Sequence, residues 1–304
     1  MNSADRSGIA LRNIPLLKKL LAKVEDRPWQ RMDEAELGPA RDIPSMLGEE
    51  ELRFYHWLSR QMSDVQGAVV DLGSFVGGST AHLAEGARAG GATDKQVYAF
   101  DHFAATEKVK EKQLYAKGVE PFEGDNILQL SQQYLSPWAP NITFRQGRIE
   151  GSRWREGPIS MLVLDASKTT SVTDRIARLF FPSLIPGRSV IVQQDELHWK
   201  EPWISAQMQR LEAYFAPICH VPGNTMAYVT VKRIGPMALH RARVAGLSDR
   251  DLIDDLHTSS IRLKAFGVAP QIERQAEAVR LNPGKRKAWR FRKRPPRRTP
   301  REVE

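Results

Sequence analysis

Short, continuous apolar runs alternate with amphipathic segments over most of the chain. The apolar runs predict strands at 67–72, 96–101, 141–146, 159–165, 188–194 and 225–232, with one more around Cys219. The amphipathic segments predict helices at 78–89, across 105–135, at 170–181 and at 201–215. Apolar strands separated by helices are typical of a mostly parallel sheet with helices on both faces. We therefore expect a doubly wound α/β fold with a seven-stranded sheet.

Helical spacing also occurs on both sides of this core. Apolar residues from Ile9 to Val24 recur every three or four positions and predict an amphipathic helix. It could lie on a membrane surface, but packing on its own domain is the simpler interpretation. Further helices are expected at 48–62, after the plausible N-cap Ser248, and near 270–280. At the far end of the sheet, the short connection through Pro222-Gly223 predicts an antiparallel hairpin at a sheet edge.

The patterns divide the chain into four parts. An N-terminal helical segment takes up 1–47, the α/β domain 48–234, and a C-terminal helical extension 235–283. The rest, 284–304, is a basic tail. Because this tail is rich in charge and contains Pro295, Pro296 and Pro300, we expect it to be disordered.

The positive charge is concentrated in that tail. The chain has a net charge of +9, and residues 285–304 contain ten Lys/Arg and two Glu, so the rest of the chain is almost neutral. The tail could be a solvated segment that aids solubility. It could also attach the protein to nucleic acid or another anionic surface.

The cysteine content and the N-terminus limit the protein class. The single cysteine, Cys219, excludes an intramolecular disulfide and a cysteine-rich zinc site, and we expect it to be a buried apolar residue. Arg12, Asn13 and Lys18 interrupt the apolar N-terminal run, so it predicts neither a signal peptide nor a transmembrane segment. These features favour a cytoplasmic protein.

The most informative motif is VVDLGSFVGGST, which occupies 69–80. An apolar strand reaches Asp71, and a glycine-rich turn then leads into a helix that begins near Ser79. Glycines allow a ligand to approach the main chain, and the helix N-terminus favours an anionic group. The dinucleotide motif GxGxxG is excluded because Phe75 stands where a glycine is needed, and no Gly-Lys-Ser/Thr of a P-loop follows.

This motif resembles the first motif of class I S-adenosylmethionine-dependent methyltransferases, and the resemblance extends over roughly 50–232. It implies that Asp101, in VYAFDHF, binds the ribose hydroxyls and that Arg148 and Ile149, in GRIEG, contact the adenine. Asp165, in ISMLVLDAS, would face cofactor and acceptor. The cofactor residues implied in this way are Asp71, Gly73, Ser74, Gly77, Gly78, Ser79, Asp101, His102, Arg148, Ile149 and Asp165.

Within this family, the fourth and fifth strands resemble those of the macrocin-type sugar O-methyltransferases. That branch often holds a divalent metal on acidic residues at these strand ends, which implies Mg²⁺ on Asp165 and Asp195. The chain departs from the pattern, because Ser167 and Lys168 replace the usual acid and histidine. Gln193 and Gln194 also precede the single acid of the fifth strand. Lys168 could therefore replace the metal cation.

A hydroxyl acceptor needs a base, and four residues are candidates: His198, Asp195, Asp165 and His102. We favour His198, because an unperturbed histidine titrates in the useful range. Alternatively, His198 is a structural ring packed among Trp199 and Trp203. These tryptophans and Trp154 could also stack on a sugar or an aromatic acceptor.

Three functions remain open from the sequence. The first is O-methylation of a sugar, a glycan or a small natural product, with the insert at 103–133 setting the specificity. The second is RNA methylation that uses the basic tail, although no Asn/Asp-Pro-Pro-Tyr/Phe motif is present. The third is a non-catalytic binding protein on the same fold. Neither the acceptor nor the oligomeric state can be predicted from the sequence.

Overall fold

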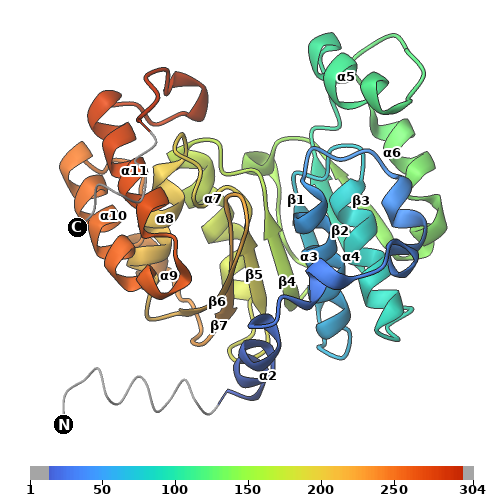
Figure 1. Ribbon diagram of the computed structural model, residues 1–304, viewed down its shortest axis with the longest axis horizontal. Coiled ribbons are helices and arrows are strands. Elements are labelled where there is room, and N and C mark those ends of the chain that lie inside the picture. Colours follow the sequence, from blue (N-terminus) through green and yellow to red (C-terminus); the bar gives the residue numbers. More distant parts are fainter. Residues whose placement is uncertain (1–13, 297–304) are drawn as a thin grey trace. The chain divides into compact units, whose positions relative to one another are not determined.

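The computed structural model describes residues 14–296 (Figure 1). The start of the predicted N-terminal helix, before residue 14, and the last part of the tail, 297–304, lie outside the described residues. The described part of that helix is α2, Pro15–Val24. Between residues 14 and 296, no helix is long and apolar enough to cross a membrane.

The elements follow the predicted order closely. The strands are β1 (Ala68–Leu72), β2 (Val97–Asp101), β3 (Ile142–Gln146), β4 (Ile159–Leu164), β5 (Val190–Gln193), β6 (Phe215–Val221) and β7 (Thr225–Thr230). The α-helices that follow α2 are α3 (Glu49–Gln61), α4 (Gly78–Ala89), α5 (Glu107–Gln113), α6 (Leu128–Tyr134), α7 (Thr170–Phe180), α8 (Pro202–Arg210), α9 (Pro236–Arg241), α10 (Asp249–Arg262) and α11 (Ala269–Leu281). Within the described residues the sheet has seven strands in the order β3-β2-β1-β4-β5-β7-β6. The predicted fold class, a mostly parallel sheet with flanking helices, is confirmed.

The chain forms two compact units. The first unit is Ala22–Val163, and the second combines the described residues of Met1–Leu21 and Leu164–Glu304. The four-part division expected from the sequence remains a prediction.

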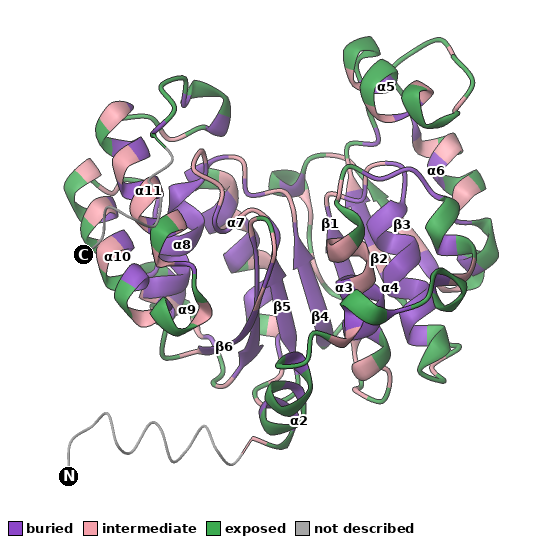
Figure 2. Ribbon diagram, viewed as in Figure 1, coloured by how far each residue is buried: buried purple, intermediate pink, exposed green. Residues whose placement is uncertain are grey.

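In the first unit, β1 pairs with β2 and β2 with β3, all in parallel. Every residue of β1 is buried, as Figure 2 shows, which explains its unbroken apolar run. The register places Asp101 opposite Gln146, so the carboxyl ends of β2 and β3 lie together. Helix α3 packs closely on α4: a Cβ atom on Gly86 would lie 2.2 Å from the backbone oxygen of His56.

In the second unit, β7 pairs antiparallel with both β5 and β6, which confirms the predicted edge hairpin. Cys219 on β6 is buried, as expected. The backbone amide of Asp251 donates a 3.1 Å hydrogen bond to Ser248 Oγ, and the Asp251 side chain accepts from Ser248 in return. This reciprocal cap confirms Ser248 as the start of α10.

The expectation of disorder is wrong for residues 284–296. Phe291 is only 2% exposed, and its ring lies 6.0 Å from the ring of Trp203. The Asn282 side chain binds the backbone of the following segment. Its Oδ1 accepts from the amides of Arg292 and Lys293, and its Nδ2 donates to the carbonyl oxygen of Lys293. The buried ring of Phe291 anchors this segment, while the neighbouring charged side chains stay in water. The net charge of a segment does not show that one of its residues is such an anchor.

The close approach of α3 and α4 predicts that Gly86→Ala destabilises the protein. The new methyl group would overlap the backbone oxygen of His56, so the two helices must separate. We expect the free energy of unfolding, measured in urea, to fall by about 2 kcal/mol. Gly235→Ala is the control, because a Cβ atom at Gly235 meets nothing within 4 Å. An equal effect of both substitutions would contradict this account of the packing.

Candidate functional site

The glycine-rich turn joins β1 to α4 and requires unusual backbone conformations. Gly73 and Gly77 have φ of 105° and 110°, values that favour glycine. Phe75 lies between them with φ of 52°, which is unusual for a bulky residue. Its amide donates a 2.9 Å hydrogen bond to Asp101 Oδ2. The end of β2 therefore stabilises the strained part of the turn.

Asp101 holds a second loop in the same way. Phe103 also has a positive φ, 49°, and its amide donates a 2.7 Å hydrogen bond to Asp101 Oδ1. Each carboxylate oxygen thus accepts one backbone amide and has another lone pair to offer. Asp101 is partly exposed, so it can accept from a neutral diol while it organises both loops.

Asp71, by contrast, supports the turn from inside. It is 1% exposed, and its Oδ2 accepts from Ser79 Oγ at 2.7 Å and from Thr80 Oγ1 at 2.6 Å. Ser74 is buried as well, with its Oγ 2.7 Å from Thr80 Oγ1. Burial raises the pKa of Asp71 to about 6, although the two hydroxyl donors oppose the shift. Asp71 is therefore placed to fix the start of α4.

Two of the glycines serve packing within the protein. A Cβ atom on Gly77 would lie 2.8 Å from Leu135 Cδ1, and one on Gly78 would lie 2.6 Å from Ser45 Cβ. Leu135 and Ser45 therefore require glycine at these two positions, and the part of Gly77 and Gly78 in cofactor binding stays a prediction. A sequence motif cannot show which atoms approach a glycine.

The loop after β3 lies next to Asp101, as the sequence predicts. The Gly147 amide donates to the backbone oxygen of Asp101 at 2.9 Å. Ile149 begins a short 3-10 helix, Ile149–Gly151, and is 8% exposed, whereas the Arg148 side chain is exposed. His102 is also exposed. The first unit therefore brings together the turn, Asp101 and the Arg148-Ile149 loop.

The second unit contains a cluster of opposite charges around Lys168. Its Nζ lies 2.8 Å from Asp165 Oδ1, contacts Asp195 Oδ2, and lies 3.6 Å from Glu201 Oε1. Burial lowers the pKa of Lys168, but the three carboxylates outweigh burial and raise it above its usual value. Burial and the neighbouring Asp195 raise the pKa of Glu201 to about 9, so we expect this side chain to be protonated at neutral pH.

This cluster does not fit the expected Mg²⁺ site. The ammonium group of Lys168 lies between Asp165 and Asp195, where the metal was expected. Among residues 14–296, no three His, Cys, Asp or Glu side chains are grouped to hold a metal ion. Sequence reasoning identified Lys168 as a possible substitute for the cation but overlooked Glu201, although the acid lies in the same HWKEPW segment as His198.

His198 lies at the edge of the cluster. Its Nδ1 is 3.8 Å from Glu201 Oε1 and forms no hydrogen bond with the described residues. Burial lowers its pKa, and the nearby Asp195 opposes that shift only in part, so His198 is neutral at pH 7.

The three tryptophans considered for stacking have different environments. Trp203 is fully buried and donates through Nε1 to the Ser167 backbone oxygen at 2.8 Å, so stacking on an acceptor is wrong for this residue. Trp154 packs edge-on against Tyr98, with 5.0 Å between ring centroids. Trp199 is half-buried, and its ring centroid lies 6.2 Å from that of His198. Lys200 Nζ lies 5.3 Å from the centroid of the Trp199 ring, so this ring already has a cationic partner, and its stacking on an acceptor stays a prediction.

No protein-family model matches the chain, and a search of curated proteins found no match. The solved O-methyltransferase NovP is similar, with 15% sequence identity and a TM-score of 0.48 over 74% of this chain and 100% of that one. A putative rRNA methylase from Clostridium thermocellum shares 12% identity over 58% and 95% of the two chains, with a TM-score of 0.39.

The MycE methyltransferase of the mycinamycin biosynthetic pathway, in complex with Mg, SAH and mycinamycin VI, is also similar. It shares 14% identity over 65% of this chain and 55% of its own, with a TM-score of 0.33. At these identities and TM-scores, the function has to be argued from the residues of this chain.

The raised pKa of Asp71 predicts a specific pH dependence of stability. The folded state binds the Asp71 proton more tightly than the unfolded state, in which the pKa is 3.8. The contribution of Asp71 to stability is therefore complete below pH 4 and falls by about 3 kcal/mol as the pH rises through 6. Asp71→Asn should lack this component. Urea unfolding of both proteins between pH 4 and 7 measures it, and parallel pH profiles would contradict the assignment.

Proposed function

We propose that this chain is an S-adenosylmethionine-dependent methyltransferase that acts on a hydroxyl group of a sugar, a glycan or a small natural product. The observation that carries the proposal is the Asp101 carboxylate. It holds two loops through backbone amides and still has acceptor capacity at the carboxyl end of β2. A carboxylate in this position suits a vicinal diol such as that of a ribose.

The residues around Asp101 fit the other parts of the cofactor. Ile149 offers an apolar contact for the adenine, and the N-terminus of α4 suits the carboxylate of the amino-acid part. Gly73 keeps the turn open at the end of β1, and Asp71 fixes the start of α4 through Ser79 and Thr80. S-adenosylmethionine supplies an electrophilic methyl group. The protein has to bind it, orient the acceptor and exclude water.

We assign the handling of the acceptor to the Lys168 cluster and His198. Lys168 is a cation fixed by Asp165 and Asp195, and its side chain is 41% exposed, so it can donate a hydrogen bond to an acceptor oxygen. His198 is neutral at pH 7 and takes the proton of the hydroxyl at a ring nitrogen. Glu201, protonated and 3.8 Å from His198 Nδ1, carries no charge that would oppose or balance the resulting imidazolium. In this proposal Lys168 takes the place of Mg²⁺, and the nearby Asp195 supplies the negative charge that favours the imidazolium.

The proposal predicts that S-adenosylhomocysteine (SAH), the cofactor after loss of its methyl group, binds to the purified protein and that Asp101 recognises its ribose. In calorimetric titrations, removal of both ribose hydroxyls from SAH should weaken binding at least tenfold, because the hydrogen bonds lost involve a charged acceptor. The protein is unchanged in this comparison, so misfolding cannot account for the result. Asp101→Ala should abolish the difference between the two ligands.

Glu34→Ala is the matched control for Asp101→Ala, because Glu34 is an exposed carboxylate of the same unit. It should bind SAH as tightly as the unmodified protein. Absence of SAH binding to the intact chain would overturn the proposed function. Equal affinities for SAH and its dideoxy analogue would exclude the role assigned to Asp101.

The role of Lys168 as a built-in cation gives a test that needs no acceptor. Lys168→Ala leaves Asp165 and Asp195 without their cation and should lower the free energy of unfolding by about 1 kcal/mol, because the lysine is partly exposed. Added Mg²⁺ should then raise the melting temperature of this variant but not that of the unmodified protein. Lys232→Ala, at an exposed lysine, is the control. Stabilisation of the unmodified protein by Mg²⁺ would contradict the proposal that Lys168 takes the place of the metal.

A further inference from the structure

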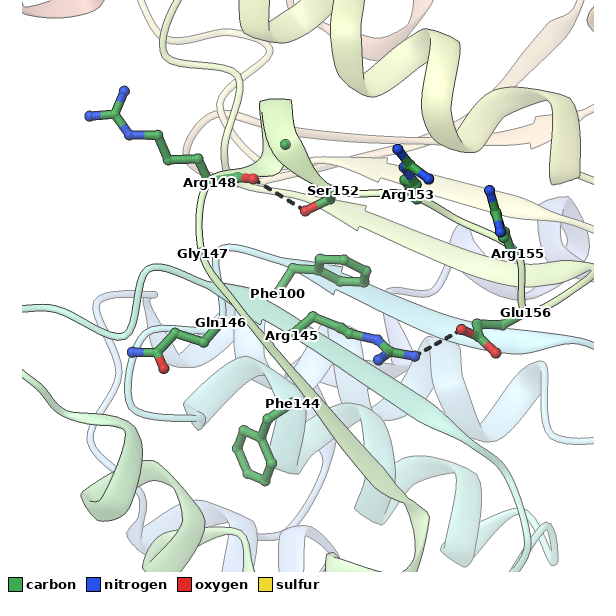
Figure 3. A pocket seen from close by; sticks show the side chains of 11 residues that line it. Phe100, Phe144, Arg145, Gln146, Gly147, Arg148, Ser152, Arg153, Arg155 and Glu156 are labelled. Carbon is green, nitrogen blue, oxygen red and sulfur yellow. Dashed lines mark hydrogen bonds and ion pairs between the residues drawn. The ribbon is translucent and has the colours of Figure 1, made fainter.

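The first unit contains a cavity of about 670 Å³ beside the carboxyl end of β3 (Figure 3). Its wall is formed by Phe100 of β2, by the end of β3 from Phe144 onward, and by residues of the segment 147–156 that follows β3. Four arginines line it, Arg145, Arg148, Arg153 and Arg155, against one acidic residue, Glu156. A cavity of this size is in the range of small-molecule sites.

The arginines are not neutralised by the protein itself. Glu156 is committed to Arg145, with 2.8 Å between its Oε1 and Arg145 Nη2, and Figure 3 shows this pair below Phe100. Within residues 14–296, the guanidinium groups of Arg148, Arg153 and Arg155 form no hydrogen bond or ion pair. In Figure 3, Arg153 and Arg155 lie side by side, and Arg148 extends away from them. A bound anion would give Arg153 and Arg155 the negative partner that the protein does not supply.

We propose that this cavity binds a small molecule that carries a diphosphate group, such as a nucleoside diphosphate or its ester. Guanidinium groups form paired hydrogen bonds to phosphate oxygens, and a diphosphate offers enough oxygens for several arginines. The cavity shares Arg148 with the predicted cofactor loop, but Arg153 and Arg155 are not among the predicted cofactor residues, and a neutral adenine does not explain them. The diphosphate is therefore assigned to Arg153 and Arg155, and this assignment does not depend on the proposed methyl transfer.

The distribution of charge favours a small molecule over a nucleic-acid strand. A strand requires a basic stripe that follows several phosphates. Here the arginines are gathered within residues 145–155 around one concave site, and outside residues 285–304 the chain is almost neutral.

The test compares pyrophosphate, ADP and adenosine by isothermal titration of the full chain in about 0.15 M salt, which screens loose surface binding. The variant is Arg153→Gln/Arg155→Gln, which leaves Arg148 and the predicted cofactor residues intact. We expect pyrophosphate to bind and the double variant to weaken pyrophosphate and ADP at least tenfold. Adenosine has only the adenine and ribose that the proposed cofactor site recognises, so any affinity for it should be equal in both proteins. Arg31→Gln, at an exposed arginine of the same unit, should change nothing.

Three results would overturn the proposal. The intact protein does not bind pyrophosphate or ADP. The double variant binds them as tightly as the intact protein, which would place the ligand elsewhere, including on the basic tail. A twelve-nucleotide RNA binds more tightly than ADP and loses this affinity in the double variant, which would identify the site as an RNA contact. SAH affinity, measured in parallel, should be equal in both proteins, so the outcome is separate from that of the methyltransferase proposal.

Discussion

The first unit depends on one carboxylate that satisfies two strained loops. Phe75 and Phe103 both have left-handed backbone conformations, which cost about 1 kcal/mol or more for a residue with a side chain. Both amides point at Asp101, and the Gly147 amide donates to its backbone oxygen. Three segments that are far apart in the sequence are thereby fixed around one residue. A ligand that binds Asp101 meets loops that are already in place, so little ordering entropy opposes binding.

The second unit depends on a different interaction, the placement of an ammonium group among acids. Asp165 follows β4 and Asp195 follows β5, and without a cation their charges would repel each other. Lys168 supplies that cation from the same chain, so the charge balance does not depend on a bound metal. The high pKa of Glu201 has another cause: burial and the nearby Asp195 raise it, and Lys168 offsets them only in part.

The sequence predicts the fold well because strands and helices depend on local patterns, namely the spacing of apolar residues and the residues that cap helices. The ends of the apolar runs lie within three residues of the strand ends, and Ser248 caps the N-terminus of α10 as predicted. The errors concern contacts between distant segments. Phe291 is buried although it lies in a basic tail, Trp203 is buried and not open to stacking, and Glu201 lies 3.6 Å from Lys168. Such contacts depend on which segments meet in space, and local patterns carry little information about this.

The central claim is that Asp101 is the ribose contact of a cofactor site. A crystal structure of the protein with SAH tests this claim most directly. The account predicts both ribose hydroxyls within hydrogen-bond distance of the Asp101 carboxylate and the adenine against Ile149. SAH bound at another place, or with its ribose away from Asp101, would contradict the account.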